Sequence, residues 1–215
     1  MDFKKNQDTI LAQLDFPNVF TIGGLMLSLF SVICSIQNNF YAAIICMIFS
    51  GMVDLFDGVI ARRLERTPLQ AEVGKQLDSL VDACSFGFSP VVFAYCFGLQ
   101  DPYSVGLLAF YAAMATLRLA YFNSTGLSAS GEKSFFTGLP VIYAALFVPV
   151  GFLSQFFLAD TAVQWLLRGI YLLLAIAMVS PIQVIKIKGA WYGVFAAGAV
   201  LLASAYGWAI FQSMH

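Results

Sequence analysis

Charged residues are scarce in this chain. They make up 11% of its 215 residues, whereas 60% are apolar, and the mean hydropathy is +0.82. A soluble domain of this size needs a more strongly charged surface, so the composition indicates an integral membrane protein. The few cations form neither a basic tail nor a basic stripe, and no nucleic-acid partner is expected.

Histidine and closely spaced cysteines are also lacking. The one histidine is the last residue, and the four cysteines stand singly in apolar stretches with no C-x-x-C spacing. A zinc site, a disulfide framework and a redox site are therefore not expected. The cysteines are interpreted as small buried hydrophobic residues.

A cleaved signal peptide is not indicated either, because the first 16 residues are mixed in polarity and no short apolar core with a cleavage site follows. Phe3, Ile10, Leu11 and Leu14 fall near one helical face. This pattern predicts a short amphipathic helix at residues 1–16 that lies on the membrane surface. A frayed leader is the alternative.

Long apolar runs dominate the remaining residues, 17–215, which are expected to form one transmembrane domain. Seven runs approach the length of about 20 residues that a helix needs to cross a bilayer. They predict an all-α, polytopic helical bundle with six core transmembrane helices and an extra C-terminal one. Asn18 is expected to cap the first helix. The expected helices cover residues 18–36, 39–63, 72–99, 103–124, 138–158, 162–185 and 189–211.

The basic residues indicate an orientation. If the first helix runs from inside to outside, ten of the eleven basic residues gather on the inner side, and Arg168 is the exception. By the positive-inside rule, the N-terminus and residues 54–82 face the cytoplasm. We expect a location in the cell inner or plasma membrane.

Four aspartates stand where the second and third expected helices approach each other. The connection around Pro68 makes the two helices antiparallel, so residues on their facing sides share one membrane depth. At 100° per residue, the second helix carries Asp54, Asp57, Gly58 and Ala61 on one stripe, and the third carries Gly74, Asp78 and Asp82 on another.

These carboxylates need a counter-charge. Each costs about 2.5–3.5 kcal/mol at the bilayer centre, and their mutual repulsion adds to that cost. Mg²⁺ and Mn²⁺ prefer carboxylate oxygens together with substrate phosphates, and two ions about 3.5–4 Å apart suit four clustered aspartates. The alternative is a set of hydrated helix-end charges, with small residues that serve helix packing.

The two glycines support a ligand on these faces. Glycine inside a helix costs about 1 kcal/mol relative to alanine, so Gly58 and Gly74 suggest that another group approaches the backbone closely. A flat nucleotide or a diphosphate would fit this low surface, with Arg62 at its edge.

The pattern D-x-x-D-G-x-x-A-R followed by G-x-x-x-D-x-x-x-D, residues 54–82, resembles the signature of the CDP-alcohol phosphatidyltransferases. The resemblance covers residues 18 to 188, and the seventh helix is an addition. It implies homodimers, two divalent metal ions (Mg²⁺ or Mn²⁺) and transfer of a phosphatidyl or phospho-alcohol group from a CDP-linked donor. The implied metal ligands are Asp54, Asp57, Asp78 and Asp82, with Asp82 as general base. Asp54, Gly58, Ala61, Arg62 and Gly74 would bind the nucleotide and diphosphate.

One departure from the signature concerns the interval between Arg62 and Gly74. Eleven residues separate them, which is longer than is usual in the family. The extra residues are expected to lie in the loop around Pro68.

Later segments resemble the phosphatidylserine synthase branch, on "LDSLVDACSFGFSP", "LRLAYFN" and "FFTGLP". The resemblance implies CDP-diacylglycerol and L-serine as substrates, with phosphatidylserine and CMP as products. Ser79, Arg118, Asn123 and Lys133 would bind the acceptor or a lipid phosphate.

Other interpretations of the acceptor residues remain open. Arg118 could form a salt bridge with an aspartate, Asn123 could cap its helix, and Lys133 could be only an inside-facing charge. Tyr121 occupies the position of the branch's usual second cation, which favours an uncharged or zwitterionic acceptor. Another acceptor, such as glycerol 3-phosphate or inositol phosphate, is the alternative within the family. An ion-binding membrane transporter is the alternative outside it.

Overall fold

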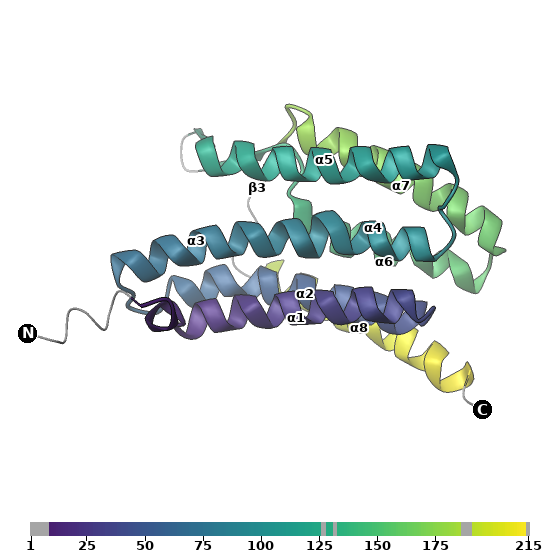
Figure 1. The fold of residues 1–215 in the computed structure, drawn as a ribbon, viewed down its shortest axis with the longest axis horizontal. Helices are drawn as coiled ribbons and strands as arrows, with labels where there is room; N and C mark the ends of the chain where they lie inside the picture. The colour runs from purple at the N-terminus through teal and green to yellow at the C-terminus, as the bar shows by residue number, and fades with distance from the viewer. Residues whose placement is uncertain (1–8, 126–127, 131–132, 186–190, 214–215) are drawn as a thin grey trace, which may run out of the picture.

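The computed structural model describes residues 9–125, 128–130, 133–185 and 191–213. It is predominantly helical, and the α-helices lie side by side along one long axis (Figure 1). In chain order the helical elements are η1 (Leu11–Gln13), α1 (Phe16–Ile36), α2 (Phe40–Ala61), α3 (Pro68–Asp82), η2 (Ala83–Phe88), α4 (Ser89–Cys96), α5 (Pro102–Thr125), η3 (Val141–Tyr143), α6 (Ala144–Phe152), η4 (Leu153–Phe156), α7 (Asp160–Val179) and α8 (Trp191–Ser213).

Among the described residues, six of the expected membrane spans are long and apolar enough to cross a bilayer. One of them is the continuous helix Pro68–Cys96, which consists of α3, η2 and α4. The fifth expected helix is shorter than predicted, covers Val141–Phe156 and contains Pro149. The start of α1 and the end of α8 lie at opposite ends of the bundle (Figure 1), as an odd number of passages requires. The expectation of a polytopic helical membrane protein is confirmed.

A small antiparallel sheet was not expected. The strands β1 (Ser128–Ser130), β2 (Lys133–Thr137) and β3 (Gln183–Ile185) pair in that order. This sheet provides hydrogen-bond partners for backbone groups in the connections that follow α5 and α7.

The starts of two helices differ from the prediction. Asp15, not Asn18, caps α1, because its carboxylate accepts a hydrogen bond from the Asn18 backbone N–H at 3.0 Å. The third expected helix begins at Pro68 instead of residue 72, since Thr67 and Gln70 form a reciprocal capping box.

The segment before α1 was expected to be an amphipathic helix at residues 1–16. Residues 1–8 lie outside the described residues. The part that follows contains the single 3₁₀ turn Leu11–Gln13, on which Ile10 and Leu11 are exposed. Its position on a membrane surface stays a prediction.

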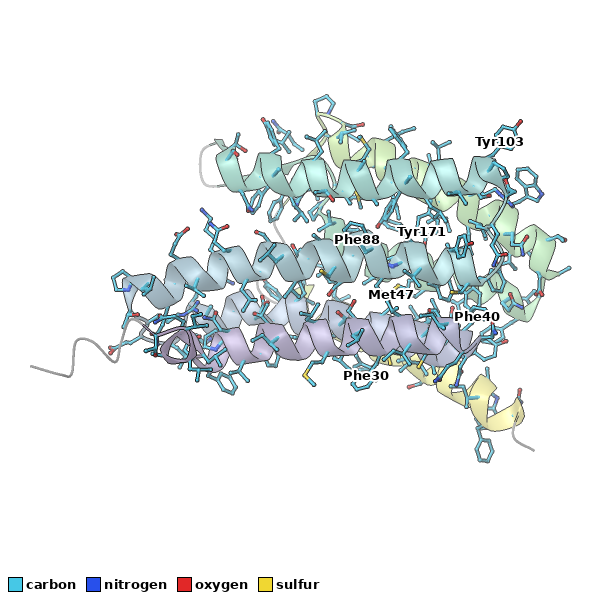
Figure 2. The ribbon with its side chains drawn as sticks, viewed as in Figure 1. Phe30, Phe40, Met47, Phe88, Tyr103 and Tyr171 are labelled. Atoms are coloured by element: carbon cyan, nitrogen blue, oxygen red, sulfur yellow. The ribbon has the colours of Figure 1, made fainter. Side chains whose placement is uncertain are left out.

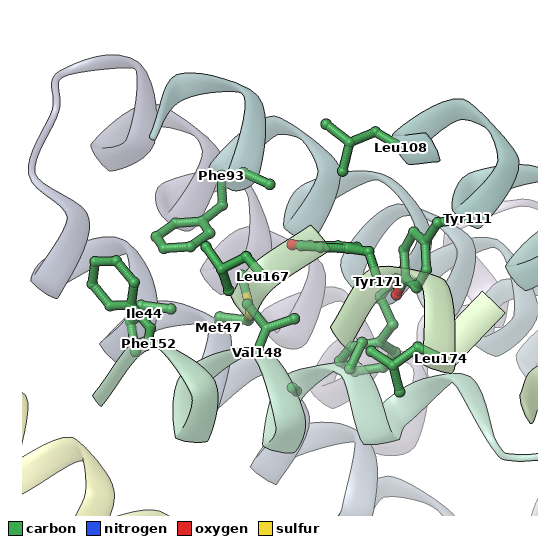
Figure 3. Packing of buried hydrophobic residues seen from close by; sticks show 14 of the residues in the cluster. Ile44, Met47, Phe93, Leu108, Tyr111, Val148, Phe152, Leu167, Tyr171 and Leu174 are labelled. Carbon is green, nitrogen blue, oxygen red and sulfur yellow. Dashed lines mark hydrogen bonds between the residues drawn. The ribbon is translucent and has the colours of Figure 1, made fainter. Parts of the chain in front are cut away.

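Aromatic and aliphatic side chains fill the centre of the bundle. Phe152 packs edge-to-face against Phe93 with ring centroids 5.0 Å apart, and Tyr111 packs in the same way against Tyr171 (Figure 3). Phe30 and Tyr103 instead project outward and are exposed (Figure 2). Large exposed apolar side chains of this kind are expected where the solvent is lipid.

Tyr111 also replaces a backbone hydrogen bond that Pro90 cannot make. Pro90 has no N–H to donate to the Phe86 carbonyl four residues earlier. The buried Tyr111 hydroxyl donates to that carbonyl instead, at 2.5 Å. The bond fixes the π-helical η2 segment, which begins directly after Asp82.

Arg168, the exception to the charge rule, is paired at the far end of the bundle. Its Nη2 lies 2.8 Å from an Asp101 carboxylate oxygen, and its Nε donates to Ser104. Hydrogen bonds from Ser104 and Arg168 hold the pKa of Asp101 below its usual range. Asp101 therefore compensates the charge of Arg168 at the end of the bundle that the other basic residues avoid.

Gly138 is a position that only glycine fits. Its φ is +75°, and a Cβ there would collide with the Met178 carbonyl. Gly138→Ala is expected to lower the free energy of unfolding by about 1–3 kcal/mol, because strain and collision act together. Thermal unfolding in detergent measures this. In the control Gly169→Ala the new Cβ meets nothing within 4 Å, and equal melting temperatures of the two variants would contradict the prediction.

Candidate active site

The two acidic stripes meet as the sequence predicted. Asp54 from α2 and Asp78 and Asp82 from α3 each place a carboxylate oxygen within 4.8 Å of the others. They meet because α2 and α3 run antiparallel, with their facing turns at the same end of the bundle. This cluster of three is called the aspartate cluster below.

Asp57 lies beside the aspartate cluster. Its side chain is buried, 7% exposed, and accepts a hydrogen bond from the Thr21 hydroxyl of α1 at 3.0 Å. Asp57 interacts electrostatically with Asp54 and Asp78. A third helix, α1, thus helps to position the acids, which the sequence reasoning did not foresee.

The chemistry of these oxygens fits a divalent cation. In the aspartate cluster, Asp82 Oδ1 is buried and has no hydrogen-bond partner among the described residues. A buried carboxylate oxygen without a partner is costly unless a cation or a proton donor reaches it. Hard carboxylate oxygens at this spacing suit Mg²⁺ or Mn²⁺, so Asp54, Asp78 and Asp82 are suitably placed to hold such an ion. A ligand role for Asp57 stays a prediction.

A pocket of about 240 Å³ opens beside the aspartate cluster. Three helices and the loop before α3 form its wall. Five of the residues predicted to form the site lie on that wall, namely Asp57, Gly58, Ala61, Gly74 and Asp78. The other residues of the wall are Pro17, Asn18, Thr21, Arg66, Ala71 and Lys75. A Cβ added to Gly58 would have Arg62 Nη1 as its nearest neighbour, at 3.4 Å, so this face is low, as predicted.

Arg62 itself is not on the wall of this pocket. It follows the last residue of α2 and is exposed. Asp54 also does not line the pocket, and it belongs to the adjoining aspartate cluster. The assignment of both residues to nucleotide binding stays a prediction.

Arg66 lines the pocket, although the sequence analysis assigned it no role. Its Nε lies 2.6 Å from an Asp15 carboxylate oxygen, and its Nη2 donates to Asn18 Oδ1 at 2.7 Å and to the Gln70 carbonyl at 2.8 Å. These bonds tie the start of α1 to the start of α3 along one wall of the pocket. The sequence feature that could have pointed to Arg66 was the long interval between Arg62 and Gly74.

The extra residues of that interval are not all loop, contrary to expectation. Residues from Pro68 onward belong to α3, which the capping box extends toward its N-terminus. A Cβ on Gly74 would lie 2.5 Å from both Arg66 Nη2 and Asn18 Oδ1. The close approach predicted at Gly74 is therefore made by side chains of the protein itself.

Arg118 lies inside the bundle near the acids. It is 6% exposed, and its guanidinium carbon lies 5.1 Å from the Phe122 ring centroid and 5.7 Å from that of Phe136. It interacts electrostatically with Asp82 and Asp54. Among the described residues its Nε and Nη2 have no hydrogen-bond partner, and no carboxylate forms an ion pair with it. The salt-bridge interpretation is therefore not supported.

Ser79 and Asn123 are brought together. Asn123 Nδ2 donates to Ser79 Oγ at 2.8 Å, which joins α3 to α5. Asn123 lies two residues before the end of α5. The backbone of Lys133 lies in β2, but its side chain is outside the described part of the structure. The substrate roles of these three residues stay predictions.

Comparisons with known proteins agree with this arrangement. The family model described as CDP-alcohol phosphatidyltransferase matches residues 14–180. The CDP-diacylglycerol–serine O-phosphatidyltransferase of Bacillus subtilis is 31% identical over 133 residues, which are 60% of this chain and 71% of that protein. The archaetidylserine synthase of Methanothermobacter thermautotrophicus is 28% identical over 187 residues, 86% of this chain and 75% of that protein.

A further relative has a different name. The phosphatidylcholine synthase of Borreliella burgdorferi is 27% identical over 141 residues, which are 65% of this chain and 57% of that protein. The names of these relatives thus differ in the acceptor, while the family match spans the acidic stripes, the pocket and Arg118. This chain belongs to the CDP-alcohol phosphatidyltransferase family.

Proposed function

We propose that this protein transfers the phosphatidyl group of CDP-diacylglycerol to the hydroxyl of L-serine, with release of CMP. The observation that carries the proposal is the buried Arg118 near Asp82, whose Nε and Nη2 have no hydrogen-bond partner among the described residues. A buried guanidinium without partners requires an anionic ligand, and its planar fork matches a carboxylate. L-serine offers a carboxylate and a nucleophilic hydroxyl in one small molecule.

The acids supply the donor side of the reaction. Asp54, Asp57, Asp78 and Asp82 would hold two divalent cations, whose charge would neutralise the donor diphosphate and the charge that develops at phosphorus. The pocket beside them has room for the cytidine part of the donor, since Gly58 and Ala61 leave its α2 wall low. Asp57 is kept in place by Thr21.

Asp82 is proposed as the general base. Its Oδ1 has no hydrogen-bond partner in the described part of the chain, so one carboxylate oxygen could accept a proton while the other serves as a ligand. The serine hydroxyl would give its proton to Asp82 as its oxygen bonds to the phosphorus that carries the lipid. The bond from that phosphorus to the CMP oxygen would break, and CMP would leave.

Arg118 is the one buried cation among the side chains that the structure describes, and this argues against phosphorylated acceptors. A phosphate monoester carries up to two negative charges and would require more than Arg118. Tyr121, at the position where a second cation is usual, is 52% exposed and supplies no charge. Choline, suggested by the name of one relative, is itself a cation that Arg118 would repel.

The decisive experiment is an acceptor panel. Purified protein receives CDP-diacylglycerol, Mn²⁺ or Mg²⁺, and one of L-serine, glycerol 3-phosphate, inositol phosphate or choline, and CMP and lipid products are measured. CMP release with serine alone supports the proposal. Release only with another acceptor rejects serine, and no release together with metal-ion flux in liposomes favours a transporter.

Arg118→Gln is expected to raise the KM for serine by about 10–100-fold, because a hydrogen-bonded charge contributes about 1.5–3 kcal/mol. The KM for the donor should change little. Initial rates of CMP release at varied serine and donor concentrations measure both constants. Arg168→Gln is the matched control, since Arg168 is paired with Asp101 at the opposite end of the bundle. Equal increases in both KM values would contradict an acceptor role.

We also propose that the site faces the cytoplasm in the cell inner or plasma membrane. The distribution of basic residues supports this orientation. Arg168 is the one basic residue expected on the outer side, and its pairing with Asp101 compensates its charge there.

A further inference from the structure

We propose that α8 and α2 together form a groove for one acyl chain of the donor, so that α8 selects the donor by chain length. This inference rests on the proposed function for the donor but not for the acceptor. It assigns a role to the helix that follows the family match, which ends at residue 180.

The groove lies between α2, the η3–α6 segment and α8, and has a volume of about 220 Å³. Gly51 and Leu55 line it from α2, and Trp191, Val194 and Gly198 line it from α8. Apart from the Tyr143 hydroxyl and the Trp191 indole N–H, the side chains on its wall are apolar or glycine, so its surface matches a hydrocarbon better than a polar headgroup.

The groove is continuous with the candidate active site along α2. Leu55, on its wall, directly follows Asp54, so groove and acids lie on adjacent faces of one helical turn. The ring of Phe56 lies 6.4 Å from that of Tyr192, which holds the start of α8 beside the last turns of α2. A lipid whose phosphate sits at the aspartates can therefore reach the groove directly.

The direction in which the groove runs into the membrane also suits a lipid whose phosphate lies at the aspartates. α2 ends at Ala61 on the side of the acids, and the groove extends from Leu55 back to Ile48, toward the membrane interior. The lining part of α8, Trp191 to Leu202, spans about 16 Å at 1.5 Å per residue. An acyl chain that descends from the headgroup level follows this path.

Gly198 provides a test because it can be enlarged without collision. A Cβ there meets nothing within 4 Å, and the residue lines the groove. Gly198→Leu is expected to raise the ratio of the KM for a dioleoyl donor to that for a dihexanoyl donor by about tenfold or more, since one or a few methylenes have effects of this size in apolar pockets. Gly193→Leu is the matched control on α8, since Gly193 also has open space and does not line the groove. An unchanged ratio in Gly198→Leu would overturn the proposal.

A second measurement uses a variant with an intact groove. Trp165→Phe with Trp208→Phe leaves Trp191, on the groove wall, as the only tryptophan. CDP-diacylglycerol with brominated acyl chains is expected to quench its fluorescence saturably, and an equal mole fraction of brominated phosphatidylcholine should quench it much less. Equal quenching by both lipids would show that the groove holds any bilayer lipid and would overturn the proposal. A failed serine assay with selective quenching would reject only the acceptor assignment.

Discussion

Asp82→Asn is expected to lower kcat by about 10²–10⁴-fold, the range over which a general base contributes. Asparagine has the shape of aspartate but cannot accept the proton of the acceptor hydroxyl. The buried Oδ1 of Asp82, which has no hydrogen-bond partner within the described ranges, is the atom that would be lost as a base. Rates of CMP release at saturating serine and donor measure the effect, and equilibrium binding of CDP-diacylglycerol in the presence of Mn²⁺ measures the donor affinity separately.

The two measurements distinguish a base from a metal ligand. If Asp82 acts as the base, donor binding is retained while turnover is lost. Loss of both together would indicate that Asp82 acts chiefly through the cations. Turnover close to that of the unmodified protein would remove the role entirely. Glu72→Gln is the control on the same helix, since Glu72 is exposed and bonds only to Gln76 among the described residues.

The aspartate cluster was predictable because helical periodicity determines it. Residues spaced by three and four positions share a helix face, and a short connection makes neighbouring helices antiparallel. The positions of Asp54, Asp78 and Asp82 follow from these two rules alone. The approximate bounds of the six long helices follow equally from their apolar length, whereas the fifth expected helix is shorter than its apolar run predicted.

Residues that enter the site from distant segments were not predictable in this way. Thr21 and Asn18 lie on α1, on a buried face that they share with Gly24, Ser28, Ser31 and Ser35. The three- and four-residue spacing of these small and polar residues marks a packed helix face, but it does not say which helix that face meets. Arg66 reaches Asp15, and the two are separated by fifty intervening residues. Pairing across such a separation depends on how the helices pack, for which a single sequence holds no signal. The small sheet was missed for the same reason, since α6 and α7 separate β2 from β3 in the chain.

Removal of divalent cations is expected to abolish CMP release, with activity restored by Mn²⁺ or Mg²⁺. The aspartates would otherwise repel the donor diphosphate from the place where it must react. Asp78→Asn should raise the half-saturating Mn²⁺ concentration by at least about tenfold, because loss of even an outer partner of a metal ligand weakens affinity by about 10–100-fold. Titration of chelator-treated protein with Mn²⁺, followed by CMP release, measures both effects, and full activity in excess chelator would contradict metal dependence.

Thermal unfolding tests the same cations without reference to catalysis. A ligand at about 100 times its Kd stabilises the folded state by about 2.7 kcal/mol per site, so Mn²⁺ should raise the melting temperature of the unmodified protein clearly. Asp78→Asn removes one of three carboxylates whose oxygens lie within 4.8 Å of one another. Without metal this variant should melt higher than the unmodified protein, and with Mn²⁺ it should gain less. Such a crossing of the two responses is expected only if the acids are placed close together to hold cations, since hydrated and independent helix-end charges would give neither effect.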